Sequence, residues 1–326
     1  ENGATTITSD DKGHAVSIAI PYGTYVVVES KTPHNMKTIK PFEVKISENH
    51  PDKPQTWRVF LDREFTAKLR VIKKDSDTKQ TVLVPNAEFK IFNIDKNEYV
   101  KQYTTYPSKV EHTSFFTDED GDLILPEALK IGNYRIEEVS APFGYVVNDK
   151  YVNISVDTDT AFETDGDTND AIITVEYSDA PAVGEMTVEK KGEVLDGFKG
   201  GLHASSYEKE FVYKEGSLAG AKFKVYAAED IYTADNQKDA DGNRIKYYSK
   251  GDLVTTLTTG KDGKATAKNL PLGQYRVVEV EAPYGYVLNP NEQKVTFTYV
   301  DDKTPVIKES LTFSDDRQKL DMSVTK

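Results

Sequence analysis

Apolar and polar residues alternate along several short segments of the chain, a pattern typical of strands with one buried face. Leu69, Val71 and Lys73 share one such face. The same alternation recurs in four more segments, at 25–29, 134–138, 186–190 and 275–279. Turn signals such as Asp120-Gly121 separate the segments, and helical periodicity is weak. The pattern predicts an all-β chain folded as an array of antiparallel sandwiches.

Two motifs occur three times each, so the chain is internally repetitive. The first reads Gly-x-Tyr-x-φ-x-Glu with a Pro four residues later, and its acidic residues are Glu29, Glu138 and Glu279. The second places an Asp eleven positions before a Lys, and its pairs are Asp62 with Lys73, Asp179 with Lys190, and Asp315 with Lys326. Each repeat therefore begins with a Lys strand, contains the Glu strand and ends with an Asp strand.

These motifs divide the chain into units. Residues 65–180 form a complete second unit, and residues 181–316 form a complete third unit with loop insertions. Residues 1–64 correspond to the C-terminal part of a first unit, without a Lys strand. Residues 317–326, the tail, correspond to the first strand of a following unit. We expect the chain to be a piece of a longer array, which also suits the lack of a visible signal peptide or wall-sorting signal.

The repeated Lys, Glu and Asp share strand faces with apolar residues, so we expect them to be buried. Burial of a lone charge is costly and favours the neutral forms of amines and carboxylic acids. A neutral amine is a nucleophile, a protonated carboxyl group is an electrophile, and a Glu between them can move protons. Held in contact, Lys and Asp can therefore form an amide with loss of one water. A simple buried salt bridge is the alternative reading.

Composition and charge argue against several classes of partner and site. The net charge is −13, which argues against nucleic acid and anionic lipid as partners. No apolar run approaches membrane-spanning length, so we expect no membrane insertion in this fragment. The chain has no Cys, so disulfides cannot stabilise it. The five His show no metal-ligand spacing, and no nucleophile elbow is present. We expect no metal, no cofactor and no enzymatic turnover.

The combined motifs resemble the collagen-adhesin B-type domain, also called SpaA-like or prealbumin-like, of Gram-positive adhesins and pilins. The resemblance rests on Ile72-Lys73-Lys74-Asp75 and Glu189-Lys190-Lys191-Gly192, on the Ala87-Glu-Phe89 strand, on the Ala-Pro-x-Gly-Tyr corners and on the terminal Asp. It implies tandem inverse-immunoglobulin Greek-key β-sandwiches in an elongated array. It also implies that Lys bonds to the Asp of the last strand with Glu as catalytic partner.

Carried over, the resemblance implies two sets of reacting residues. They are Lys73, Glu138 and Asp179 in the second unit, and Lys190, Glu279 and Asp315 in the third. In the first unit, Glu29 and Asp62 have no Lys strand to react with, because that strand is missing from the fragment. A neighbouring chain that donates its tail would place Lys326 beside them, although truncation of the array explains the same pattern.

The sequence thus predicts a structural stalk of a cell-wall-attached adhesin or pilin, stabilised by Lys–Asp isopeptide bonds, and located outside a Gram-positive cell. Its expected partners are the adjacent domains of the array. The alternative is an adhesin whose loops bind a host extracellular protein or glycan directly. The sequence contains no aromatic cluster that identifies such a binding patch.

Overall fold

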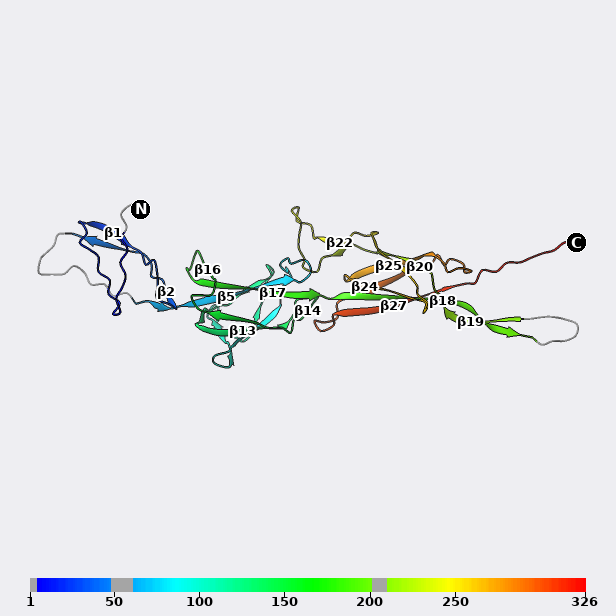
Figure 1. Cartoon of the computed structure of the whole chain (residues 1–326), viewed down its shortest axis with the longest axis horizontal. Helices are drawn as coiled ribbons and strands as arrows, with labels where there is room; N and C mark the ends of the chain where they lie inside the picture. Colours follow the sequence, from blue (N-terminus) through cyan, green and yellow to red (C-terminus); the bar gives the residue numbers. More distant parts are fainter. Residues whose placement is uncertain (1–4, 48–60, 201–209) are drawn as a thin grey trace.

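The computed structural model describes residues 5–47, 61–200 and 210–326, and every regular element within these ranges is a β-strand. Figure 1 shows an elongated molecule with β1 near one end and the C-terminus at the other. Two sandwiches follow one another along the long axis between these ends. Among the described elements there is no apolar helix of membrane-spanning length.

The first and second units contain seventeen of the strands. Those of the first unit are β1 (Gly23–Val27), β2 (Met36–Lys37), β3 (Phe42–Ile46) and β4 (Arg63–Glu64). Those of the second unit are β5 (Thr66–Asp75), β6 (Glu88–Asn93), β7 (Glu98–Tyr99), β8 (Gln102–Thr104), β9 (Val110–His112), β10 (Phe115–Phe116), β11 (Asp122–Ile124), β12 (Leu129–Lys130), β13 (Gly132–Ser140), β14 (Tyr145–Val146), β15 (Val152–Val156), β16 (Glu163–Thr164) and β17 (Ala171–Pro181).

The third unit follows almost without a break after β17. Its strands are β18 (Val183–Lys199), β19 (Glu210–Ser217), β20 (Lys222–Ala227), β21 (Ile231–Tyr232), β22 (Lys246–Tyr248), β23 (Leu253–Thr258), β24 (Lys264–Leu270), β25 (Gly273–Glu281), β26 (Gln293–Phe297) and β27 (Val306–Asp315). One of the loop insertions expected in the third unit lies after Lys190, and it includes a hairpin, because β18 continues beyond the sandwich and pairs with β19.

The period-two pattern determines which side chains of β5 enter the core. Alternate residues of this strand are buried over its whole length, so Leu69, Val71 and Lys73 point inward together. The first half of β18 repeats the pattern with Met186, Val188 and Lys190. Each of the two complete units has its own apolar cluster, and the Lys lies at the end of the row of apolar residues in each.

The first and last strands of each complete unit are neighbours and run parallel. β5 pairs with β17 with Lys73 opposite Tyr177, and β18 pairs with β27 with Lys190 opposite Phe313. The expectation of purely antiparallel sheets is therefore wrong at this pair of strands. The parallel register places the Asp two residues beyond the Lys in both units, at Asp179 and Asp315, and it brings the two ends of each unit together.

The Glu strand of each complete unit lies in the opposite sheet of the sandwich. β13 is flanked by β6 and β15, and β25 is flanked by β20 and β26. The Glu therefore approaches the core from the side opposite to the Lys and Asp. In the first unit β1 pairs with β3 as β13 does with β15.

The three corners after the Glu strands share one backbone conformation. Asn35, Gly144 and Gly285 have positive φ angles of 64°, 92° and 84°, so Asn replaces Gly at one corner as the sequence suggests. Their carbonyl oxygens accept hydrogen bonds from the amides of Phe65, Ala182 and Gln318, each three residues after the Asp of the second motif. The chain therefore leaves all three units along the same path.

An insertion of the third unit contacts the second unit near the end of its Lys strand. The amide of Leu83 donates to the carbonyl oxygen of Asp235 at 2.8 Å, and Thr78 Oγ1 donates to Asp235 Oδ2 at 2.8 Å. Gln237 Nε2 donates to the carbonyl oxygen of Thr81 at 2.6 Å. Asp235 is almost fully buried, with 1% of its surface exposed. We call this contact the insertion joint.

A second set of contacts holds the same two units on another element, the loop between β26 and β27. The amide of Val147 donates to the carbonyl oxygen of Asp302 at 2.8 Å, and Tyr299 Oη donates to the carbonyl oxygen of Tyr145 at 2.9 Å. The ring centroids of Phe143 and Tyr299 lie 4.7 Å apart. The second and third units are therefore joined at two places.

Candidate functional site: two buried lysine–carboxyl clusters

The second unit brings its three predicted residues into direct contact. Lys73 Nζ lies 2.5 Å from Glu138 Oε1 and 2.5 Å from Asp179 Oδ1, and none of the three side chains is exposed. The contact to Glu138 has hydrogen-bond geometry, whereas among the described residues neither carboxyl oxygen of Asp179 has a hydrogen-bond partner. The amine therefore lies against the Asp179 carboxyl group without being oriented as a donor to it.

The third unit repeats the arrangement. Lys190 Nζ donates to Glu279 Oε2 at 2.8 Å and also contacts Asp315 Oδ1, and the three side chains are again fully shielded from solvent. Lys and Asp come from the parallel pair β18 and β27, and Glu comes from β25 in the facing sheet. The same three strand types thus build both clusters.

Aromatic rings enclose each lysine amine. Lys73 Nζ lies 5.5 Å from the ring centroid of Phe89 and 4.7 Å from that of Tyr177. Lys190 Nζ lies 5.8 Å from the ring centroid of Phe223 and 6.0 Å from that of Phe313. The rings keep water away from the amine and the carboxyl groups, which increases the electrostatic interaction between them.

Burial changes the acidity of the carboxyl groups. Desolvation raises the pKa of Asp179 to about 8, because the loss of hydration outweighs the attraction of Lys73, and the nearby Glu138 charge adds to the increase. Burial likewise raises the pKa of Glu279, although its hydrogen bond to Lys190 opposes the change. At neutral pH Asp179 is therefore mostly protonated, the form in which its hydroxyl group can leave as water.

Each Glu is also held by the main chain of the segment that follows its corner. Glu138 Oε2 accepts a hydrogen bond from the amide of Asn148 at 2.9 Å, and Glu279 Oε2 accepts one from the amide of Asn289 at 3.2 Å. Glu29 Oε2 accepts one from the amide of Ile39 at 2.9 Å. The donor stands ten residues after the Glu in all three units. Glu29 thus already has the backbone contact of the two complete clusters.

The remaining predicted residues are not brought together within one chain. Glu29 and Asp62 are partly buried in the first unit, and Asp62 directly precedes β4. Lys326 is exposed in the tail, at the opposite end of the molecule from β1 (Figure 1). The part of the first unit between Ser47 and Leu61 lies outside the described residues. A role for these three residues stays a prediction.

The sequence reasoning missed two kinds of site residue. It did not assign the aromatic rings around each amine, although Phe89 and Tyr177 occupy alternating positions next to the motifs. It also did not assign Asn148 and Asn289, although both stand ten residues after the motif Glu. Their common spacing was a visible signal, but its meaning depends on contacts between segments far apart in the sequence.

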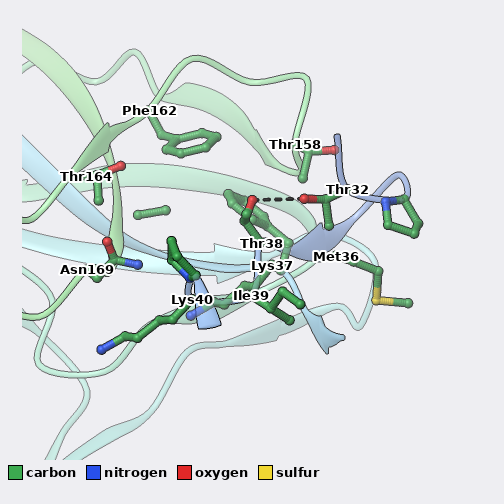
Figure 2. A pocket seen from close by; sticks show the side chains of 14 residues that line it. Thr32, Met36, Lys37, Thr38, Ile39, Lys40, Thr158, Phe162, Thr164 and Asn169 are labelled. Atoms are coloured by element: carbon green, nitrogen blue, oxygen red, sulfur yellow. Dashed lines mark hydrogen bonds between the residues drawn. The ribbon is translucent and has the colours of Figure 1, made fainter. Parts of the chain in front are cut away.

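A separate hollow of about 490 Å³ lies where the first and second units meet (Figure 2). Phe162, Met36 and Ile39 line it, together with several threonines, and Thr32 and Thr38 are joined by a hydrogen bond of 2.9 Å. Its ionisable lining residues, Lys37 and Lys40, are not buried. The hollow therefore lacks the buried polar groups that the two lysine clusters contain.

Comparison with known families identifies the modules. A family model described as a SpaA prealbumin-like fold domain matches residues 1–58, 67–170 and 208–310. These matches cover most of the chain, and the chain belongs to this family. The resemblance and the all-β sandwich class expected from the sequence are confirmed.

Individual relatives match a smaller part of the chain or are less identical to it. The trypsin-resistant surface T6 protein of Streptococcus pyogenes serotype M6 is 32% identical over 75 residues, which is 22% of this chain and 14% of that protein. The TIE protein of Bacillus anthracis is 23% identical with a TM-score of 0.43, over 95% of this chain and 45% of that one. GBS52, the minor pilin of Streptococcus agalactiae, is 13% identical with a TM-score of 0.27, over 80% of this chain and 100% of that one. The chain thus spans well under two thirds of the first two proteins.

Proposed function

We propose that the chain is a load-bearing segment of a surface stalk or pilus outside a Gram-positive cell, and that each complete unit joins its own Lys to its own Asp through an isopeptide bond. The single observation that carries the proposal is the contact of Lys73 Nζ with Asp179 and Glu138 at 2.5 Å in a site closed to solvent. Membership of the SpaA family and the similarity to a streptococcal surface protein support the location.

The chemistry follows from the positions of three groups. Glu138 accepts a proton from the Lys73 ammonium group, which frees a lone pair on Nζ. Nζ then attacks Cγ of the protonated Asp179, and Glu138 passes a proton to the departing hydroxyl group and takes one from nitrogen. The products are an amide, one water and a protonated Glu138. Lys190, Glu279 and Asp315 carry out the same steps in the third unit.

Preorganisation explains why an unactivated carboxyl group reacts. The amine and the carboxyl group are held in contact by two strands that the whole sandwich fixes, which replaces an encounter in solution by an intramolecular step. The aromatic rings exclude the bulk water that otherwise favours hydrolysis. The reaction happens once in each unit and is not repeated, so the unit is modified by it and does not act as an enzyme on another molecule.

The parallel strands give the bond a mechanical role. In an array under tension, force enters the second unit at the start of β5 and leaves it at the end of β17. A bond between Lys73 and Asp179 carries the force directly across, so residues 74–178 are bypassed. Without it, the load falls on strand hydrogen bonds that are each worth only about 1 kcal/mol net. The third unit continues the same path through β18 and β27.

Intact-mass measurement of the folded protein tests the proposal. A mass lower than the sequence mass by two waters is expected, one for each complete unit. Tandem mass spectrometry should then find branched peptides that join Lys73 to Asp179 and Lys190 to Asp315. A folded protein of unmodified mass refutes the cross-linking and leaves two buried ion pairs.

A further inference from the structure

Asn148 and Asn289 take part in matching contacts on both sides of their clusters. Each donates its main-chain amide to the motif Glu, as described above. Asn148 Nδ2 also donates to the carbonyl oxygen of Ser178 at 2.9 Å, and Asn289 Nδ2 donates to the carbonyl oxygen of Ser314 at 3.0 Å. Ser178 and Ser314 directly precede the reacting Asp of their units. One residue thus connects the Glu of one sheet to the Asp strand of the other.

The side-chain oxygen of each Asn has a different local contact. Asn148 Oδ1 accepts from the amide of Lys150 at 3.1 Å, and Asn289 Oδ1 accepts from the amide of Asn291 at 3.0 Å. This pattern is an Asx turn, and it fixes the side chain so that Nδ2 faces the Asp strand. The turn alone uses only the oxygen, and many polar residues form such a turn. The donation from Nδ2 is the additional feature that a turn does not require.

The first unit has the main-chain contact to Glu without the side-chain contact to the Asp strand. Ile39 stands ten residues after Glu29 and donates its main-chain amide to that carboxyl group, but it has no side-chain amide. The contact to Glu therefore does not depend on Asn. The Asn side chain is present in the two units that carry a complete Lys, Glu and Asp set within this chain. Its separate task concerns the strand that carries the electrophile.

We propose that Asn148 and Asn289 are positioning residues that hold the Asp carbonyl carbon against the lysine amine while the isopeptide bond forms. The inference rests on the proposed cross-linking. Neither Asn side chain contacts the reacting groups, so each side chain acts through the main chain next to Asp179 or Asp315. One net hydrogen bond to the main chain is worth enough to change the rate by about fivefold to tenfold if it is made in full only in the reactive geometry.

Two substitutions distinguish the contacts of Asn148. Asn148→Ala removes both side-chain contacts and keeps the main-chain amide. Asn148→Asp keeps the Asx-turn oxygen but replaces the Nδ2 donor by an acceptor. The same two changes at Asn153, an exposed residue of β15, serve as controls. Newly synthesised chain is sampled over time, and peptide mass spectrometry gives the dehydrated fraction of each unit separately.

We expect both Asn148 variants to cross-link the second unit about fivefold to tenfold more slowly, while the third unit reacts at the normal rate. In Asn148→Ala the rate should fall with rising pH at the same midpoint as in the unchanged protein, because burial and not Asn148 raises the pKa of Asp179. Circular dichroism should remain unchanged. The third unit provides the reciprocal test with Asn289→Ala.

Other results have distinct meanings. A normal rate in Asn148→Ala overturns the positioning role, whatever the Asp variant does, because a slow Asp variant alone reports its added charge. A changed circular dichroism spectrum together with loss of cross-linking in both Asn148→Ala and Asn289→Ala also overturns it in favour of a folding role. Absence of water loss in the unchanged protein refutes the proposed function itself.

Discussion

Replacing Glu279 by Gln separates the cross-link of the third unit from its packing. Gln has the same size and still accepts the hydrogen bond from the amide of Asn289, while Lys190 and Asp315 remain as an ion pair. It cannot take the proton from the amine, so we expect Glu279→Gln to block the bond. The variant should be lighter than its own sequence mass by one water instead of two, because the second unit still reacts.

The effect on stability follows from the length of chain that the bond encloses. Lys190 and Asp315 are separated by 125 positions. A covalent link closing a loop of this length lowers the entropy of the unfolded chain by an amount worth about 5 kcal/mol at 25 °C. For a unit of this size such a loss corresponds to a melting temperature lower by about 15 to 25 °C. The third unit should therefore melt first in the variant.

Differential scanning calorimetry with mass spectrometry on the same sample measures both quantities. Glu281→Gln is the matched control, since it lies two residues further along β25 and forms only a surface pair with Lys222. That pair is worth at most about 1 kcal/mol. A Glu279→Gln protein that still loses both waters refutes the proton-transfer role of Glu279. A variant that loses the bond but melts normally refutes the loop-entropy reasoning.

Three further predictions concern the second unit and its joint. Lys73→Met should abolish water loss in the second unit alone and make it sensitive to trypsin on heating, whereas Lys74→Met on the opposite strand face should do neither. Before the bond forms, the raised pKa of Asp179 contributes stability that is fully present below pH 3.8 and is lost as the pH rises through about 8. The same titration removes the protonated carboxyl group that reacts, so cross-linking of newly folded chain, followed by mass spectrometry, should slow above about pH 8. A rate that keeps rising through this range contradicts a reaction of the protonated form. Asp235→Ala should broaden the distribution of distances between spin labels on the second and third units, whereas the control Asp239→Ala, in the exposed part of the insertion, should not. If the distribution of Asp235→Ala is as narrow as that of the control, the insertion joint has no stiffening role.

The insertion joint adds to the contacts between neighbouring units. The second and third units contact each other through the insertion and through the β26–β27 loop. The first and second units are joined at the corner, where Asn35 and Thr158 exchange hydrogen bonds of 3.2 Å from their amides. In the proposed stalk, contacts on two elements limit bending between the second and third units.

Much of the site was accessible from the sequence because strand periodicity is local. Leu69, Val71 and Lys73 have the same phase, so their alternation alone predicts that Lys73 enters the core. The eleven-residue spacing of Asp179 and Lys190 also follows from local order, since one strand leads directly into the next. Repetition made these patterns recognisable without a structure.

The contacts across each sandwich required the tertiary structure. Local alternation does not specify whether the first and last strands of a unit run parallel, nor in which register Lys73 faces Tyr177. The hydrogen bonds from Leu83 to Asp235 and from Asn148 to Ser178 join segments that are distant along the chain.

The sequence by itself determined which residues are buried and which are repeated, because side-chain direction in a strand depends only on its neighbours. The tertiary structure decided which buried groups meet. Bringing an amine, a carboxyl group and a proton carrier into contact depends on the register of two parallel strands and on the packing of a second sheet over them, and both are properties of the whole unit.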